Sequence, residues 1–368
     1  LTLATPAKSQ GNKVTVREAV DLASQKLTSF GANQPEIEAA VRAVIGTTYR
    51  SLGLFDQAEP HLRTALELRR KHLGENNPET LVSLTDMALL IHDRGDSAKA
   101  AEMLGSALDM QRKVSGPNSR DTLRTISALG WVLRDQGKSA AAEDLFRLSL
   151  DGQRRATGPD SAQTIKATAE LTMVLIDQQK LDEADRLLSR AVDDAARVLG
   201  PRHPDYLYTK NIRGWLLFTQ GRYAEAEATY SSVVETAERV LPPDHAWLLM
   251  WKDNLGWAQV RTGHFEQAER TLRGVIEPSA RILGEEHRET LRAMLGLAGA
   301  ITGLGRFDEA EKLTLQVYTV TSARGPRWLN ELCLRQFVRL YSEWNKPEQA
   351  ERYRALLPAE ERSSSGAK

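Results

Sequence analysis

Apolar and polar residues follow a helical period along this chain. Residues 84–91 carry apolar side chains at i, i+3, i+4 and i+7, and residues 58–66 carry them at i, i+4, i+7 and i+8. Either spacing places the apolar side chains on one face of an α-helix. The pattern therefore predicts amphipathic helices.

The helical pattern recurs every 42 residues without an insertion, and small residues fix its phase. One alanine marks each unit: Ala58, Ala100, Ala142, Ala184, Ala226, Ala268 and Ala310. A glycine stands five residues before each of these alanines, except in the fourth unit, which has Gln179. A Gly, Ala or Thr stands twelve residues before each alanine. Three small positions per unit predict close contacts between helices.

Turn and capping residues divide each unit into two helices. A glycine turn such as Gly221-Arg222-Tyr223 can adopt the left-handed conformation that ends the first helix. The second helix ends at another glycine, for example Gly74, after a basic last turn that suits the helix dipole. The next helix begins at a residue that can cap free N–H groups: Asn77, Ser119, Ser161 or His203.

One such hairpin cannot bury its apolar face alone, so successive hairpins must stack and share a continuous core. The sequence therefore predicts an all-α fold, an α-solenoid. We expect a flexible linker over residues 1–13, a capping helix within 14–36, the solenoid over 37–357 and a disordered tail over 358–368. The last unit returns after 40 residues instead of 42, at Lys346–Glu351, as a degenerate C-terminal cap would.

Composition excludes several classes of protein. Lys plus Arg (49) balances Asp plus Glu (49), so the chain lacks the positive field that nucleic acids or acidic lipids require. The single Cys333 cannot form an intramolecular disulfide. The longest uncharged stretch, Ala293 to Gly305, has thirteen residues, fewer than the ~18 to 20 that span a bilayer. We expect neither nucleic-acid binding nor membrane insertion.

The repeat resembles a known family. The spacing of the tetratricopeptide repeat is present in Ile45, Gly46, Tyr49, Gly53, Ala58 and Ala65. The 42-residue period, with Leu73-Gly74 followed by Asn77-Pro78, is similar to the kinesin-light-chain type. This resemblance covers residues 37–357. It implies a right-handed superhelix of stacked helix-turn-helix repeats that binds other proteins.

A narrower resemblance concerns the start of the chain. VTVREAVDLASQKL (residues 14–27) and the repeat after it resemble the C-terminal repeat region of bacterial serine/threonine protein kinases. This implies a kinase domain and often a transmembrane helix upstream. Because the chain opens on Leu1 rather than Met, we expect it to be part of a longer protein. We expect a cytoplasmic location, or the extracytoplasmic side of a membrane if the parent protein has such a helix.

No catalytic motif is present in the sequence. It contains no G-x-G-x-x-G loop after a strand, and no V-A-I-K, H-R-D or D-F-G. Gly137-Lys138-Ser139 imitates the end of a phosphate-binding loop, but Val132 occupies the position of the required glycine. We expect this chain to have no enzymatic activity and no cofactor.

Other recurring residues allow both a functional and a structural interpretation. His203, His245 and His287 recur at 42 residues, but equivalent positions lie too far apart for one zinc ion, so we interpret them as loop residues. Cys333 is expected in the core rather than as a nucleophile. Three recurring aspartates could line a groove or only be solvated: Asp93, Asp135 and Asp177.

In the resembled family, positions 2, 5, 9 and 12 of each first helix line the concave face. In the middle repeats these positions hold many aromatic, Met and basic residues, which are enriched at binding hot spots. The predicted partner-binding residues are Trp131, Arg134, Lys166, Met173, Ile176, Tyr208, Asn211, Trp215, Phe218, Met250 and Trp257. At positions 5, 9 and 12 repeat 7 has no aromatic, Met or basic residue, but Leu295, Gly299 and Thr302. Alternatively, the large side chains only fill space between helices.

The leading hypothesis is a non-catalytic scaffold that binds a peptide or protein in its groove and recruits it to a bacterial serine/threonine kinase. Basic residues beside the aromatic ones suggest that the partner carries acidic residues: Arg124, Arg134 and Lys166. The alternative is a self-associating or spacer module with an empty groove, and a homo-oligomer remains open.

Overall fold

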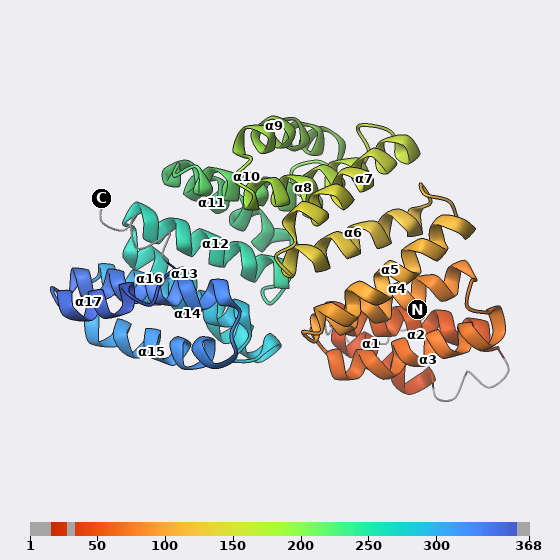
Figure 1. Cartoon of the computed structure of the whole chain (residues 1–368), viewed down its shortest axis with the longest axis horizontal. Coiled ribbons are helices and arrows are strands. Elements are labelled where there is room, and N and C mark those ends of the chain that lie inside the picture. Colours follow the sequence, from red (N-terminus) through yellow and green to blue (C-terminus); the bar gives the residue numbers. More distant parts are fainter. Residues whose placement is uncertain (1–15, 28–33, 359–368) are drawn as a thin grey trace, which may run out of the picture. The chain divides into compact units, whose positions relative to one another are not determined.

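The fold is all-helical. A computed structural model describes residues 16–27 and 34–358, and within these ranges it contains 17 helices and no strand (Figure 1). This confirms the predicted fold class. The chain divides into two compact units, residues 1–187 and 188–368, and the boundary lies within helix α9. The expected linker over 1–13 and nearly all of the expected tail over 358–368 fall outside the described residues.

Unit 1 consists of antiparallel helix pairs preceded by one short helix. Its helices are α1 (Val16–Leu27), α2 (Pro35–Ser51), α3 (Phe55–Leu73), α4 (Pro78–Asp93), α5 (Ser97–Val114), α6 (Arg120–Asp135), α7 (Ser139–Thr157) and α8 (Ala162–Asp177), and α9 spans Leu181–Val198. Unit 2 continues with α10 (Pro204–Thr219), α11 (Tyr223–Val240), α12 (Ala246–Thr262), α13 (Phe265–Leu283), α14 (Arg288–Gly303), α15 (Phe307–Arg324), α16 (Arg327–Glu343) and α17 (Pro347–Arg354).

Small residues bring the helices of each hairpin together. The seven repeating alanines are all 0% exposed. Glycines twelve residues before them pack against the second helix: a Cβ on Gly130 would lie 2.9 Å from the Phe146 ring, and one on Gly214 would lie 2.6 Å from the Tyr230 ring. The predicted close contacts between helices are therefore confirmed.

The turn and capping predictions are also confirmed. The glycine in the turn of each hairpin has a positive φ, for example 77° at Gly221. Gln179, the one exception, keeps this left-handed conformation with φ 59°. The Asn77 side chain accepts a hydrogen bond from the Glu79 N–H at 2.9 Å. The other predicted caps, Ser119, Ser161 and His203, accept equivalent bonds at the starts of α6, α8 and α10.

The recurring aspartates of unit 1 join neighbouring repeats. The Arg50 Nη1 lies 2.9 Å from the Asp93 Oδ2, and the His92 Nε2 lies 3.2 Å from the Asp135 Oδ2. Arg134 pairs in the same way with Asp177. Each basic side chain lies in the last turn of the first helix of one repeat. Its carboxylate partner lies in the first helix of the next repeat. The structure thus shows a role that the sequence did not suggest, because these aspartates bridge neighbouring repeats.

Helices cap both ends of the repeats. The Tyr49 hydroxyl donates a hydrogen bond to Asp21 of α1 at 2.8 Å. At the other end, the Tyr353 ring of α17 stacks on the Phe337 ring of α16 at 4.1 Å. The expected degenerate last unit is therefore α16 and α17. No helix within the described residues is both long and apolar enough to cross a bilayer.

Candidate functional pocket

Unit 2 contains a pocket of about 860 Å³, open to solvent, between the first helices of successive hairpins. Most of its wall comes from α10, α12, α14 and α16. This is where the sequence predicted a partner-binding stripe for these repeats.

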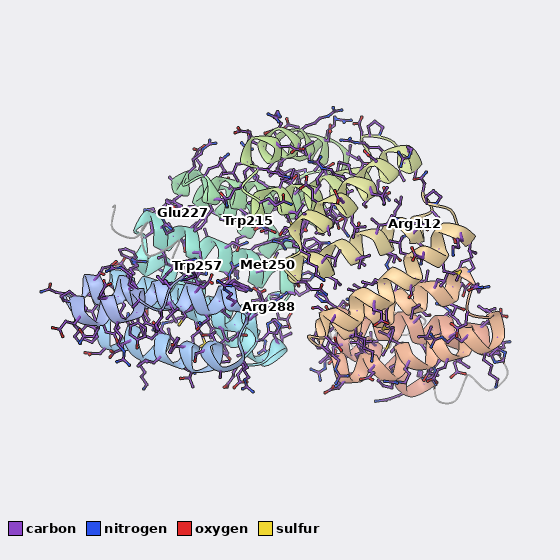
Figure 2. The ribbon with its side chains drawn as sticks, in the orientation of Figure 1. Arg112, Trp215, Glu227, Met250, Trp257 and Arg288 are labelled. Atoms are coloured by element: carbon purple, nitrogen blue, oxygen red, sulfur yellow. The ribbon has the colours of Figure 1, made fainter. Side chains whose placement is uncertain are left out.

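Aromatic side chains form one wall of the pocket. Trp215 and Phe218 of α10 and Trp257 of α12 line it, and all three are half-buried. Figure 2 labels Trp215, Trp257 and Met250, which belong to these two helices. Three predicted groove residues thus share one pocket.

Small residues of α14 allow its neighbours to approach it closely. A Cβ on Gly299 would lie 3.4 Å from Val260 of α12 and 3.4 Å from Gln336 of α16. A Cβ on Gly296 would lie 3.0 Å from the Trp257 Nε1. The neighbouring helices therefore approach α14 closely, and α14 contributes Arg292 to the pocket lining.

Four arginines line the pocket and no carboxylate does. Arg261 lies with its guanidinium 4.0 Å from the centre of the Tyr223 ring, and within the described residues it forms no ion pair with a carboxylate. The other three have acidic neighbours outside the lining: Arg292 with Asp253, Arg335 with Glu331, and Arg339 with Glu343. The lining itself is therefore positive and aromatic.

A buried polar group holds Arg292 in place. Its Nε lies 2.6 Å from the Asp253 Oδ2, and its guanidinium also donates to Asn254. The Asn254 amide donates in turn to the Asn211 Oδ1 at 3.1 Å. Burial raises the pKa of Asp253 to about 6, against the attraction of Arg292. Asn211 is only 6% exposed, so this predicted groove residue supports the pocket from below.

The remaining predicted residues of unit 2 lie beside the pocket lining. The Tyr208 ring stacks on the Trp247 ring at 5.6 Å, and Met250 packs partly buried in the same hydrophobic cluster. The sequence analysis missed Trp328, Leu332, Arg335 and Arg339, all on α16. Counting back from the last unit, which returns after 40 residues, would have placed Leu332, Arg335 and Arg339 in the stripe, and Trp328 lies one helical turn before it.

The predicted residues of unit 1 have different environments. Ile176 is 1% exposed and belongs to the core. Trp131 packs edge-on against Phe146 at 5.6 Å. The Arg134 guanidinium lies 5.3 Å from the Trp131 ring centre and is paired with Asp177. Met173 is half-buried and Lys166 is exposed. Of the three proposed acid-binding residues, Arg124 also has a partner, Asp86.

The recurring histidines cap helices. The Nδ1 atoms of His203, His245 and His287 accept hydrogen bonds from the backbone N–H two residues on, at 3.1, 3.1 and 3.3 Å. No group of three or more potential metal ligands exists in the part of the chain that the structure describes. Cys333 is 0% exposed, as expected for a core residue.

Stacked antiparallel helix pairs define the class of helical-repeat proteins. One family model, described as tetratricopeptide repeat, matches residues 37–113, 85–155, 163–239 and 216–277. A second model with the same description matches residues 254–326. The chain belongs to the tetratricopeptide repeat family. No curated protein matches it.

Several solved structures are similar to this chain. A putative kinesin light chain with nearly identical repeats from Podosopora anserina is 24% identical, with a TM-score of 0.46, covering 56% of this chain and 97% of that one. A Rap protein complexed with Competence and Sporulation Factor is 12% identical, with a TM-score of 0.59, covering 87% and 96%. The apo form of RapI is 15% identical, with a TM-score of 0.55, covering 72% and 91%. At these identities the likeness to the two Rap structures concerns the fold alone.

Proposed function

We propose that this chain is a non-catalytic scaffold whose unit 2 pocket binds a segment of a partner protein that combines an apolar anchor with acidic residues. The observation that carries the proposal is the lining itself, three tryptophans with four arginines and no carboxylate. Tryptophan and arginine are the residue types most enriched at binding hot spots. The related Rap protein was solved as a complex, which agrees with a binding role for the fold.

The charges favour an acidic partner. Arg335 is exposed. The Arg261 guanidinium donates to the Tyr223 hydroxyl and lies over the Phe218 and Tyr223 rings. A carboxylate that approaches these guanidinium groups gains charge-assisted hydrogen bonds. The apolar part of the ligand would contact Trp215, Trp257 and Trp328.

Selection from a random peptide library on the purified chain tests this proposal. We expect enriched peptides to carry Asp or Glu next to an aliphatic or aromatic residue. Trp257→Ala should weaken their binding by ~2 kcal/mol, as removal of a central hot spot does. Arg335→Glu should also weaken peptide binding, and the loss should be larger at low salt than at high salt.

Lys113→Glu is the matched control, because Lys113 is an exposed basic residue of α5 in unit 1, outside the predicted partner-binding stripe. It should leave binding of the selected peptides unchanged. Enrichment of neutral or basic peptides, or binding that Trp257→Ala does not alter, would show that the pocket has another role.

The finer part of the proposal is that the scaffold recruits a substrate or regulator to a bacterial serine/threonine kinase in the same protein. It rests on the resemblance of residues 14–27 and the repeat after them. Phosphorylation of a captured peptide by the full-length parent protein, lost with Trp257→Ala, would support it. Equal phosphorylation with both forms would exclude recruitment through this pocket.

A further inference from the structure

Helices α12 and α14 pack side by side in unit 2, and their contacts set the order of side chains along the pocket. In the first turns of α14, the Arg292 Nε donates a hydrogen bond to Asp253 of α12 at 2.6 Å. About one turn further on, a Cβ on Gly296 would lie 3.0 Å from the Trp257 Nε1. The two helices therefore run in the same direction, and Trp257 follows Arg292 along the pocket.

Arg339 of α16 reaches α14 about one more turn along. A Cβ on Gly299 would lie 3.4 Å from the Val260 Cγ1 and 3.5 Å from the Arg339 Nη1. Gly299 follows Arg292 by seven residues, which is ~10 Å along an α-helix. The order along the pocket is therefore Arg292, then Trp257, then Arg339, with two helical turns between the two arginines.

Each of these two guanidinium groups is held on one edge. Asp253 and Asn254 accept hydrogen bonds from the Nε and Nη2 of Arg292, and Glu343 accepts one from the Nε of Arg339 at 2.7 Å. Within the described residues, the Nη1 of Arg292 and both Nη atoms of Arg339 form no hydrogen bond. A guanidinium carries five N–H donors, so each group keeps donors for a ligand while its side chain is already ordered.

We propose that the pocket binds an extended segment that carries two acidic side chains three positions apart, one bonded to Arg292 and the other to Arg339. An apolar side chain between them packs on Trp257. In the polyproline II conformation, side chains three positions apart point to the same side and lie ~9 Å apart, which matches the ~10 Å between the two arginine levels. The inference rests on the proposed function, because it assigns places to the acidic and apolar parts of that ligand.

Fluorescence anisotropy with labelled synthetic peptides tests the proposal on the purified chain. Each peptide carries two glutamates in an otherwise neutral sequence, with one leucine beside the first glutamate. The glutamates stand one, three or six positions apart. We expect the three-position peptide to bind about tenfold more tightly than the other two, because only this spacing brings a carboxylate to both guanidinium groups. A peptide with a single glutamate should bind as the mismatched peptides do.

Variants of the chain assign each glutamate to its arginine. Arg339→Gln should weaken the three-position peptide about tenfold, and replacing one particular glutamate of the peptide by glutamine should then cost nothing further. Arg292→Lys keeps a positive charge beside the buried Asp253 but removes the second edge of the guanidinium, so it should act through the other glutamate. Arg270→Gln, at an exposed arginine of α13 outside the pocket lining, is the matched control and should bind as the unchanged chain does.

The outcomes separate this inference from the proposed function. Equal affinity at every spacing, or coupling of both glutamates to the same arginine, would overturn the two-position inference and leave the proposed function standing. A pocket that binds no acidic peptide would overturn both. Thermal midpoints show whether each variant still folds, and the spacing series on the unchanged chain decides the question without any variant.

Discussion

The backbone of Gly256 in α12 lies against the side chain of Leu272 in α13, and a Cβ on Gly256 would approach the Leu272 Cγ to 2.5 Å. Gly256→Ala must therefore move the two helices of this hairpin apart or force Leu272 out of its rotamer. Overpacking of this kind costs ~1 to 3 kcal/mol. We expect a loss of that size in the free energy of unfolding, measured by urea denaturation.

Gly274→Ala is the matched control within the same hairpin. Gly274 lies inside α13, and a Cβ there would have no neighbour within 4 Å. Alanine is the better helix former by ~0.5 to 1 kcal/mol, so this substitution should stabilise the chain. Equal effects of the two substitutions would refute the role given to the Gly256 contact.

Gln179 provides a second stability test. It adopts φ 59° in the turn between α8 and α9, where the other repeats have glycine. The left-handed conformation strains a residue with a Cβ, so Gln179→Gly should raise the free energy of unfolding by up to ~1 kcal/mol. Lys138→Gly tests the next position of such a turn, where φ is −86°, and should not stabilise. A thermal midpoint that Gln179→Gly leaves unchanged or lowers would count against this strain.

The fold was predictable because each repeat independently carries the same spacing of apolar, small, turn and capping residues. The fourth unit has Gln179 instead of the turn glycine, but Ala184 and the neighbouring units still fix the phase of the repeat. The turn glycines, the caps and the buried alanines all depend on local backbone geometry or on close contacts within one hairpin. Such features follow from sequence spacing without knowledge of distant parts of the chain.

The pocket was only half predictable. Trp215, Phe218 and Trp257 follow from the stripe positions, but Arg261 and Phe265 also line the pocket and lie outside the stripe. Arg335 and Arg339 stand in a unit with a shifted register, so the 42-residue spacing missed them. The pairing of Arg292 depends on Asp253, a residue of another repeat, which no single-repeat pattern contains.

The histidine cap of α14 predicts a pH dependence of stability. Burial lowers the pKa of His287 below its ordinary value of 6.5, and its Nδ1 must be unprotonated to accept the Glu289 N–H. The unfolded chain therefore binds the proton more tightly, and the free energy of unfolding falls as the pH drops below 6.5.

His287→Asn should keep the cap, as Asn77 does, without titrating. We expect its free energy of unfolding to fall less between pH 7 and pH 5 than that of the unchanged chain, by denaturant titration at several pH values. Parallel pH profiles for the two chains would contradict the prediction.

Cys333 should be chemically inert in the folded chain. Burial raises the pKa of its thiol to about 12, and the side chain is 0% exposed. The reactive thiolate is therefore almost absent at neutral pH, and reagents cannot reach the sulfur. We expect no labelling by a thiol-specific chromogenic reagent until denaturant unfolds the chain, and one equivalent afterwards. Rapid labelling without unfolding would place Cys333 in an accessible site.

Arg134 and Asp177 form an ion pair between two repeats, so we expect Arg134 to contribute to the free energy of unfolding. Arg134 and Asp177 are each about a quarter exposed or less, with exposed side-chain fractions of 20% and 26%. Pairs this close to solvent contribute ~0.2 to 1 kcal/mol. A double-mutant cycle with Arg134→Gln and Asp177→Asn should give a coupling free energy in this range, and added salt should reduce it.

Peptides selected on the unit 2 pocket should bind the Arg134→Gln chain unchanged. A loss of peptide binding without a loss of stability would return Arg134 to the partner-binding residues, where the sequence first placed it.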